Sequence, residues 1–595
     1  MKFPSDRTES QAATPEGEEL SRRPLTEMNP TITDALSQQK RSGRLAAVWH
    51  TALRPHGLVA AAYLAATAFT GAGFMGDTAD YVESLLTRVE FWEFGHLVWR
   101  PMGWLVLQVS RPLTPSMAAG DPRAEAAFAL IAINWIAGLV AVLLMRAWLS
   151  RISKREWVAT VATLAFVFSH AFLNFSQTGS SYIPGLMLLL LGLYLLARAG
   201  ERPERSTPAA LLAGAALAGS VAMWFPYVFV VPAALVSPLF MFGFDKLRMR
   251  LAVRSALTFA LTASLAYGAV LANLGIYKPA GVRTWVAASS HGVTTGGPSR
   301  VVLGLSRSFI DMGNDGVALK RFALHDPINP VSLFDLLRLS LWKLGLFYLF
   351  LCAIVINLFR STQGRRTLGL LAAGTVPLLI FAVEFDGGAV ERYLPLYPLI
   401  FLAFSCSLFS DRSRPSLKYA ALAFVIAATV TNVSALANPV LDRRQEAAVG
   451  RVKDLLPLLA RDSRLVVINQ QDELLNFRRA FPFNPLNTRL DLRVYPVVSV
   501  NTAQVDTWRE KFATLAVSDW ERGSDVWISR RVLSARPLAA WSWVEGDDRR
   551  IGWNDIHTFF ADFEVQNTAE DDDGFVMLVK SPKNERLLAM VANGV

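Results

Sequence analysis

The sequence predicts a polytopic α-helical membrane protein of about eleven transmembrane helices, followed by a small extracytoplasmic α/β domain. Three observations lead to this fold class. The chain of 595 residues is 52% hydrophobic and only 18% charged, and its mean hydropathy of +0.32 is too high for a soluble protein of this length. Its Lys and Arg residues fall in short clusters between apolar runs. Beyond residue 440 the apolar runs shrink to the length of β-strands.

Residues 1–50 differ from the rest of the chain because they are rich in Ser, Thr, Pro, Glu and Gln and lack hydrophobic periodicity. Such a composition is typical of a disordered segment. The first apolar run, at 57–75, is preceded by the basic residues Lys40, Arg41, Arg44 and Arg54. The positive-inside rule therefore predicts a cytoplasmic N-terminal tail, an uncleaved first helix and an external location for the residues that follow that helix.

The other spans are predicted from apolar windows of roughly 20 residues, which is the length that crosses a hydrocarbon core of about 30 Å. They lie near 124–146, 156–174, 180–198, 208–242 (two crossings, broken at 224–226), 255–275, 340–359, 367–383, 393–410 and 417–437. With this assignment each basic cluster between spans falls on the cytoplasmic side. Residues 51–437 then form the transmembrane domain, and its external loops are 76–113, 276–335 and 384–392.

Residues 96–113 are apolar but are not counted as a crossing. Arg100, Pro101 and Arg111 interrupt the segment, because an arginine is costly at bilayer depth and a proline breaks the backbone hydrogen-bond ladder. Omitting this crossing also makes one basic cluster cytoplasmic, namely Arg146, Arg151, Lys154 and Arg155. We therefore expect a juxtamembrane or re-entrant segment on the outer face.

The region 438–595 is predicted to be an external α/β domain. Strand-like runs occur at 463–468, 491–500, 525–529 and 575–581, with helix-like segments at 505–517 and 553–563. Roughly 150 residues are enough to bury a core.

The net charge of +10 is explained by the clusters between spans, so nucleic acid is not an expected partner. The two cysteines, Cys352 and Cys406, lie in apolar runs and are expected to be packing residues.

The stretch GDTADYVESLLTRVEFWEFGHLVWRPMGW at 76–104 follows the first apolar run and carries the main candidate residues. Asp77 and Asp80 stand three residues apart where the first helix leaves the bilayer. One interpretation is helix capping, with Asp77 at the N-cap and Asp80 as an acid in the first turn. The other is a pair of catalytic carboxylates, one of which is a general base for an acceptor hydroxyl. The two interpretations are compatible.

Further candidates for substrate binding lie in this loop and in the loop 384–392. His96 is predicted to contact a substrate or to be an imidazole at the membrane interface. Arg392 and Arg100 are candidate cations for a phosphate group, or interfacial arginines that reach the lipid headgroups. Glu384 and Asp386 are candidates for binding sugar hydroxyls or a divalent ion, or else are solvated acids. Glu391 and Tyr393, on either side of Arg392, are further candidates for substrate binding, and the alternative for Tyr393 is an aromatic anchor at the membrane interface.

These residues resemble the motifs of the GT-C superfamily of membrane glycosyltransferases, which includes the protein O-mannosyltransferases and the lipid A aminoarabinose transferases. The matching residues are Asp77 and Asp80 after the first helix, GHLVWRPMGW at 95–104, and ERYLPLYPL at 391–399. Many members of the superfamily carry Glu directly after the first Asp and a Pro-Pro pair in the second motif. This chain has Thr78 and the sequence GHLVWRP at those places.

The resemblance implies an inverting glycosyltransferase of the cell envelope with a polyprenyl-phosphate sugar donor and a glycan, lipid or protein acceptor. It implies a catalytic Asp in the first external loop and contact with membrane lipids. No cofactor is certain, and a divalent cation stays open because D-x-x-D is also a capping pattern. The balance of Arg over Lys favours a bacterial inner membrane.

The residues leave two other function classes open. One is a transporter or flippase of a lipid-linked or small polar substrate, and the other is a catalytically idle relative whose external domain organises partners. Transporters tend to carry ionisable groups near the bilayer midplane. This chain instead concentrates its acids outside its apolar runs.

The long external loop 276–335 has the length to close over a lipid-linked donor.

Overall fold

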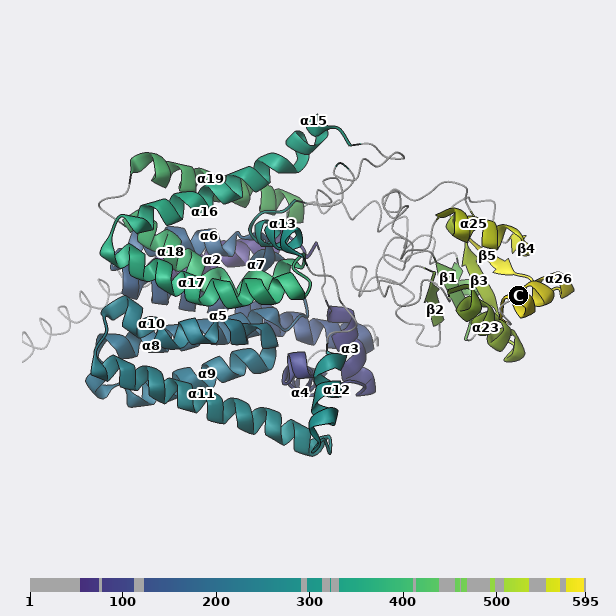
Figure 1. Cartoon of the computed structure of the whole chain (residues 1–595), viewed down its shortest axis with the longest axis horizontal. Coiled ribbons are helices and arrows are strands. Elements are labelled where there is room, and N and C mark those ends of the chain that lie inside the picture. The colour runs from purple at the N-terminus through teal and green to yellow at the C-terminus, as the bar shows by residue number, and fades with distance from the viewer. Residues whose placement is uncertain are drawn as a thin grey trace, which may run out of the picture. The chain divides into compact units, whose positions relative to one another are not determined.

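The computed structural model describes residues 54–73, 77–111, 122–289, 297–312, 322, 331–409, 414–437, 455–460, 462–467, 493–497, 508–533, 553–567 and 574–592. Helices make up the part up to residue 437, and strands with short helices make up the part from residue 455 (Figure 1). The chain divides into a unit of residues 1–55 and a unit of residues 56–595. The predicted disordered tail over 1–50 lies outside the described residues.

Apolar helices dominate the part before residue 438. They are α2 (Arg54–Phe69), α5 (Pro122–Ser153), α6 (Glu156–Val167), α8 (Tyr182–Glu201), α9 (Thr207–Met223), α10 (Val231–Phe242), α11 (Lys246–Asn273), α16 (Trp342–Phe359), α17 (Thr362–Glu384), α18 (Tyr397–Phe409) and α19 (Pro415–Ala437). Of the described helical segments, 7 are long and apolar enough to cross a membrane, and three shorter apolar ones correspond to α2, α6 and α9. The polytopic helical membrane fold is therefore confirmed, whereas the number of eleven crossings stays a prediction.

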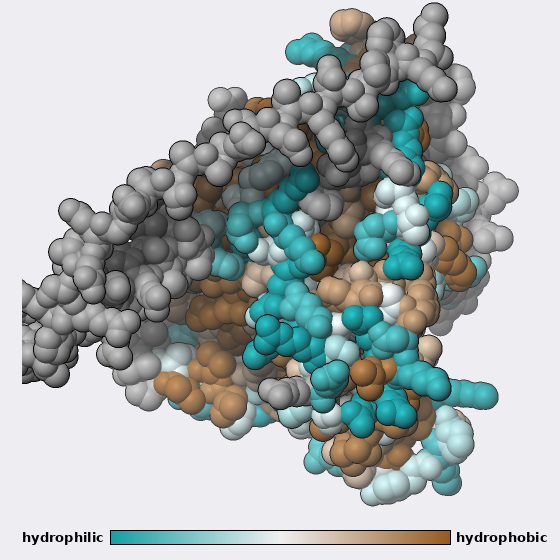
Figure 2. Space-filling model, turned by 90° about the vertical axis from the view of Figure 1, so that its left-hand side faces the viewer, coloured by the Kyte–Doolittle hydropathy of each residue, from teal (hydrophilic) through white to brown (hydrophobic). Residues whose placement is uncertain are grey.

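Basic side chains join the helix ends on one side of this helical part. Arg151 at the end of α5 pairs with Glu201 at the end of α8, with 2.7 Å between Nη1 and Oε2. Arg248 at the start of α11 donates from Nε to the carbonyl oxygen of Gly200 at 3.0 Å. Figure 2 faces these helix ends and shows hydrophilic residues grouped among hydrophobic ones. The arginines Arg151 and Arg248 at these helix ends agree with the positive-inside rule, and the cytoplasmic location of this side stays a prediction.

The segment after α2 forms short helices. They are α3 (Thr78–Thr87), the 3₁₀ turn η2 (Phe94–His96) and α4 (Trp99–Ser110). A helix of 12 residues is about 18 Å long, which is less than the hydrocarbon core of about 30 Å. The prediction that this segment makes no full crossing therefore agrees with its length. Helix α4 packs closely, since a methyl group on Gly103 would approach the side chains of Leu130 and Leu85.

Two predicted spans are interrupted. The break at 224–226 is as expected, because α9 ends at Met223 and the 3₁₀ segment η5 (Phe225–Phe229) precedes α10. The span predicted over 156–174 is not continuous, since α6 ends at Val167 and α7 (His170–Phe175) starts a new helix.

Asn432 of α19 explains how the second break is accommodated. Its Nδ2 atom donates to the carbonyl oxygens of Phe168 at 2.7 Å and Phe309 at 2.8 Å. Its Oδ1 atom accepts from the backbone N–H of Asp311 at 2.7 Å. A broken helix in a membrane frees backbone polar groups that need partners inside the protein. The fully buried Asn432 supplies them, so the carbonyl group at the end of α6 is not left without a donor.

The C-terminal part contains a five-stranded sheet in the order β2-β1-β3-β5-β4. Its strands are β1 (Arg464–Val467), β2 (Arg493–Pro496), β3 (Val526–Ser529), β4 (Val565–Asn567) and β5 (Phe575–Leu578). The first three strands are parallel, and β5 runs antiparallel to both β3 and β4. Four strands lie where the sequence predicted them, and the polar β4 was missed. The external location of this part stays a prediction.

Short helices accompany the sheet, namely α23 (Trp508–Glu521), α25 (Trp553–Ala561) and α26 (Pro582–Ala592). Every residue of β1 and of β3 is buried, so the sheet is covered on both faces. Val466 and Ile528 belong to one core cluster, with Phe512 of α23, whereas Leu465 and Trp527 belong to another. Continuous apolar runs of this kind are typical of parallel strands buried on both sides.

A buried carboxylate ties α23 to two of the parallel strands. Asp519 is fully buried and pairs with Arg464 of β1 and with Arg493 of β2, whose Nη1 lies 2.7 Å from Oδ1. The carbonyl oxygen of Asp519 also accepts from the backbone N–H of Ser524 at 2.8 Å. This acid therefore joins the C-terminal end of α23 to the N-terminal ends of β1 and β2.

Replacing Asp519 with Ala is expected to destabilise the sheet by about 3–5 kcal/mol, because the buried guanidinium of Arg464 loses its counter-charge. Glu521→Gln, at an exposed position of the same helix, is the control and is expected to change stability by less than about 0.5 kcal/mol. Amide hydrogen exchange of the β1 and β3 peptides in the full chain measures the difference. Equal protection in the two variants would contradict the role of Asp519.

Candidate active site

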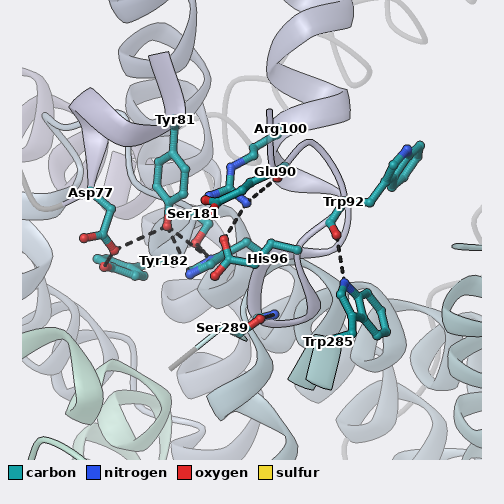
Figure 3. Close-up of polar contacts among 12 residues, drawn as sticks. Asp77, Tyr81, Glu90, Trp92, His96, Arg100, Ser181, Tyr182, Trp285 and Ser289 are labelled. Atoms are coloured by element: carbon teal, nitrogen blue, oxygen red, sulfur yellow. Dashed lines mark hydrogen bonds and ion pairs between the residues drawn. The ribbon is translucent and has the colours of Figure 1, made fainter. Parts of the chain in front are cut away.

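The carboxylate of Asp77 accepts a hydrogen bond from a tyrosine of another helix and does not cap the helix that it precedes. Asp77 occupies the N-cap position of α3, but its side chain makes no capping hydrogen bond. Instead Tyr182 donates its hydroxyl to Oδ2 at 2.8 Å, and the hydroxyl of Tyr81 lies 3.4 Å from the same oxygen (Figure 3). The N-cap position predicted from the sequence is therefore present without the capping bond. The carboxylate serves a contact between α3 and α8.

The turn before α8 is held by three other elements. The backbone N–H of Gly179 donates to Oγ1 of Thr78 at 2.9 Å, and its carbonyl oxygen accepts from the indole N–H of Trp99 at 3.1 Å. Asn134 of α5 donates to the carbonyl oxygen of Thr178 at 2.6 Å. A methyl group on Gly179 would lie 2.7 Å from the Cγ2 atom of Thr78, so only glycine fits there. The hydroxyl of Tyr182 is thus positioned by contacts with α3, α4 and α5.

His96 extends the hydrogen-bond network of Asp77. Its Nδ1 atom lies 2.7 Å from Oγ of Ser181, and its Nε2 atom lies 3.1 Å from the hydroxyl of Tyr81 (Figure 3). Burial lowers the pKa of His96 to about 4, so the ring is neutral at physiological pH. A neutral imidazole donates from one nitrogen and accepts at the other. Asp77, Tyr81, His96 and Ser181 therefore form a continuous chain of polar contacts.

Arg100 is a structural residue of this network. It is 1% exposed, its Nη1 atom lies 2.5 Å from Oε2 of Glu93, and it donates to the carbonyl oxygen of Glu90 at 2.8 Å. Its guanidinium carbon lies 5.2 Å from the ring centroid of Tyr81. Glu90 and Arg88 have φ angles of 53° and 63°, a conformation that is costly for residues other than glycine. Arg100 stabilises this turn, which argues against the predicted role of Arg100 as a phosphate-binding cation.

Arg392 lies in the 3₁₀ segment η7 (Val390–Leu396) and has a different environment. Its guanidinium carbon is near the ring centroids of Phe385 (4.6 Å), Phe381 (5.6 Å) and Trp224 (5.7 Å). Its buried Nε has no hydrogen-bond partner, and no carboxylate forms an ion pair with it, among the residues that the structure describes. Aromatic faces attract a cation without neutralising its charge. Arg392 therefore suits an anionic ligand better than Arg100 does.

The Arg392 environment adjoins that of Asp77. The ring of Trp224 lies 4.6 Å from the ring of Tyr182, which is the hydrogen-bond partner of Asp77. Glu391 is half-buried beside Arg392, and burial raises the pKa of its carboxyl to about 7. The charge of Arg392 opposes this rise, whereas the carboxylates of Asp77 and Asp386 add to it. These groups thus share one electrostatic environment.

The other predicted residues are placed as follows. Tyr393 is fully buried, and its hydroxyl donates to the carbonyl oxygen of Gly387 at 2.6 Å, so it supports the turn before η7. Asp386 is half-buried in that turn with a φ angle of 45°. Asp80 and Glu384 are exposed. The structure therefore brings Asp77, His96, Glu391 and Arg392 together and does not bury Asp80 or Glu384 with them.

Sequence reasoning missed Tyr81, Ser181, Tyr182 and Trp224. Tyr182 begins α8, and an aromatic residue at the outer end of a predicted span is ordinarily an interfacial anchor. Tyr81 follows Asp77 by one helical turn, which was a usable signal because residues at this spacing face each other. The sequence left a divalent cation open, and the described residues offer no set of ligands for one. Groups of at least three His, Cys, Asp or Glu side chains that could hold a metal are absent from the described ranges.

No protein-family model matches the chain, and no curated protein sequence matches it. Among solved structures the chain is similar to ArnT from Cupriavidus metallidurans bound to undecaprenyl phosphate, with 12% identity, 90% of this chain and 99% of that chain covered, and a TM-score of 0.47. The apo state of that ArnT is 11% identical, with 92% of this chain and 99% of that chain covered and a TM-score of 0.44. An Archaeoglobus fulgidus oligosaccharyltransferase in complex with Zn and sulfate is 11% identical, with 88% of this chain and 73% of that chain covered and a TM-score of 0.40.

The two arginines are expected to respond differently to substitution by Gln. Arg100→Gln removes the guanidinium that pairs with the buried carboxylate of Glu93 and is expected to cost about 3–5 kcal/mol of stability. Arg392→Gln removes a cation that pairs with no carboxylate among the described residues and is expected to leave the melting temperature nearly unchanged. Thermal unfolding of the two purified full-length variants in detergent measures this. Equal losses of stability would show that Arg392 is also structural.

Proposed function

We propose that this chain is an integral membrane glycosyltransferase, which transfers a sugar from a polyprenyl-phosphate donor to an acceptor hydroxyl at the extracytoplasmic membrane surface. The observation that carries the proposal is the geometry of Asp77. Its carboxylate makes no capping hydrogen bond, is held by Tyr182 and Tyr81, and lies in one electrostatic environment with Arg392. Base and cation are the two groups that this transfer needs.

Asp77 is the general base in this mechanism. A carboxylate is ionised at neutral pH and accepts the proton of the acceptor hydroxyl while that oxygen attacks the anomeric carbon. The bond between the anomeric carbon and the phosphate oxygen breaks, and its electron pair leaves with the polyprenyl phosphate. A single displacement of this kind inverts the anomeric centre. The hydroxyl groups of Tyr182 and Tyr81 orient the carboxylate so that it needs no rearrangement during the step.

Arg392 stabilises the departing phosphate. Hydrogen bonds between a guanidinium and a phosphate are among the strong ones because both groups are charged. The aromatic rings around Arg392 limit its contact with water, which strengthens its interaction with an anion. His96, being neutral, supports Tyr81 by a hydrogen bond and adds no charge of its own.

The distribution of charge favours this function over a transporter or flippase. In the described helices α2, α5, α6, α8–α11 and α16–α19, no Asp, Glu, Lys, Arg or His lies in the middle third of the helix. Transporters commonly place ionisable groups and broken helices near the midplane. Asp77 and Glu391, by contrast, lie in segments between these helices. We infer a plasma-membrane enzyme whose acceptor is a glycan, a lipid or a protein.

Asp77→Asn is expected to lower sugar transfer by about 10²–10⁴-fold, because an amide cannot accept the proton of the acceptor hydroxyl. Asp80→Asn is the matched control, since Asp80 is an exposed acid in the same helix, and it is expected to retain most activity. The measurement is a transfer assay in membranes with a panel of radiolabelled polyprenyl-phosphate sugars, at equal protein levels.

Wild-type activity in Asp77→Asn would remove this residue from the base role. Loss in Asp80→Asn with retention in Asp77→Asn would assign the role to Asp80. Transport of a lipid-linked substrate by both variants, without transfer, would favour the flippase.

The Michaelis constant for the donor is expected to rise as the pH increases from 6 to 8. The pKa of Glu391 is raised to about 7, so this residue is mostly neutral at pH 6 and mostly ionised at pH 8. Its negative charge at the higher pH offsets the attraction of Arg392 for the donor phosphodiester, whose own charge is constant over this range. A change on the order of tenfold corresponds to a shift of one pKa unit on donor binding. Initial rates at several pH values, in wild type and Glu391→Gln, test this. A pH dependence that persists in Glu391→Gln would contradict the assignment.

A further inference from the structure

The external loop between α11 and α16 contacts both halves of the candidate site. It contains α12 (Pro279–Ala288) and α13 (Pro298–Phe309). Helix α12 contacts the segment that carries His96, and α13 contacts the turn that leads to Arg392. These two segments of the site are almost 300 residues apart in the sequence and come from separate elements. One loop therefore touches both the base side and the cation side.

Helix α12 and the residue after it contact the His96 segment through two hydrogen bonds and one contact between aromatic rings. The indole N–H of Trp285 donates to the carbonyl oxygen of Trp92 at 3.0 Å, and the backbone N–H of Gly95 donates to Oγ of Ser289 at 3.3 Å (Figure 3). The ring of Trp285 also lies 5.5 Å from the ring of Phe94. These contacts fix the backbone on both sides of Phe94, directly before His96.

The contact of α13 with the Arg392 turn is a close approach of two backbones. A methyl group on Gly304 would overlap the carbonyl oxygen of Gly387 and would lie 2.9 Å from the Cε2 atom of Tyr393. A methyl group on Gly387 would lie 2.6 Å from the carbonyl oxygen of Ala382 and 2.7 Å from the Cγ2 atom of Val301. Real Cβ atoms do not approach other atoms this closely, so glycine is required on both sides of the contact.

Hydrogen bonds connect α13 to the Arg392 turn and to the end of α17. The hydroxyl of Tyr393 lies 2.6 Å from the carbonyl oxygen of Gly387 and 3.3 Å from that of Val301 in α13. The backbone N–H of Gly297, at the start of α13, donates to the carbonyl oxygen of Val383 at 2.8 Å. Since Tyr393 directly follows Arg392, a displacement of α13 is transmitted to the arginine through covalent and hydrogen-bonded contacts.

We propose that α12 and α13 are positioning elements, which hold the Asp77–His96 side and the Arg392 side of the site at the separation that transfer requires. Trp285, Ser289 and Gly304 act through the backbone that carries the site residues. The proposal rests on the proposed function, because it assigns the two sides to base and phosphate. Misplacement of a reacting group by about 1 Å can cost on the order of a hundredfold in rate.

The test for α13 is Gly304→Ala, with Gly345→Ala in α16 as the matched control, since no atom lies within 4 Å of a methyl group at that position. Gly304→Ala is expected to weaken binding of undecaprenyl phosphate to the purified full chain by about ten- to a hundredfold. In an Arg392→Gln background the same change is expected to alter binding less than about twofold, because the two residues act through one contact. Full additivity of the two losses would overturn the proposal.

The test for α12 is the double variant Trp285→Phe with Ser289→Ala, which removes both hydrogen bonds and keeps an aromatic ring. Thr284→Ala is the control, because the Thr284 hydroxyl donates only within α12, to Ala280, at 3.1 Å among the described contacts. The double variant is expected to lower kcat about tenfold or more while binding of undecaprenyl phosphate stays within about twofold. An equal kcat in the double variant and the control would overturn this part of the proposal.

Amide hydrogen exchange gives a readout that does not depend on the substrate. Faster exchange of residues 385–392 in Gly304→Ala than in Gly345→Ala supports the positioning role, and equal exchange overturns it. A wild-type chain that binds no undecaprenyl phosphate would count against the proposed function. In that case the exchange measurement still decides whether α13 determines the conformation of the Arg392 turn.

Discussion

The hydrogen bond from Tyr182 to Asp77 is the interaction on which the candidate site depends. A carboxylate at the end of an apolar bundle needs donors, and Tyr182 supplies one from the start of α8 at 2.8 Å. The turn before Tyr182 is in turn held by Thr78, Trp99 and Asn134, which belong to α3, α4 and α5. The orientation of one carboxylate is thus determined by four helices. The short helices α3 and α4 therefore take part in positioning this carboxylate, although each is too short to cross a membrane.

The two arginines near the site show how the same side chain takes different roles. Arg100 is surrounded by acceptors, because Glu93 and the carbonyl oxygen of Glu90 both lie within hydrogen-bond distance. Its charge is neutralised inside the protein and stabilises a turn with two unfavourable backbone conformations. Arg392 is surrounded by aromatic rings, which attract the cation but leave its charge available. The difference lies in the neighbours and not in burial alone.

Glycine contacts account for the packing of the loop between α11 and α16 against the site. Gly304 and Gly387 let two backbones approach more closely than any side chain allows, so α13 and the turn before η7 behave as one packed unit. On the other side of the site, α12 reaches the His96 segment through Trp285 and Ser289. A loop whose length suggested closure over a substrate thus packs against both the Asp77–His96 side and the Arg392 side of the candidate site.

The sequence by itself determined the properties that depend on local composition. Mean hydropathy and clustered basic residues were enough for the polytopic helical class, and Arg100, Pro101 and Arg111 indicated that the segment containing α4 is no full span. Four of the five strands followed from short apolar runs, whereas β4 (Val565–Asn567) is too polar to show one. Only the tertiary structure decided that Asp77 meets Tyr182, that Arg100 is paired and that Gly304 meets Gly387. These contacts join residues from 7 to more than 100 positions apart, and no local pattern records which distant side chain supplies the partner.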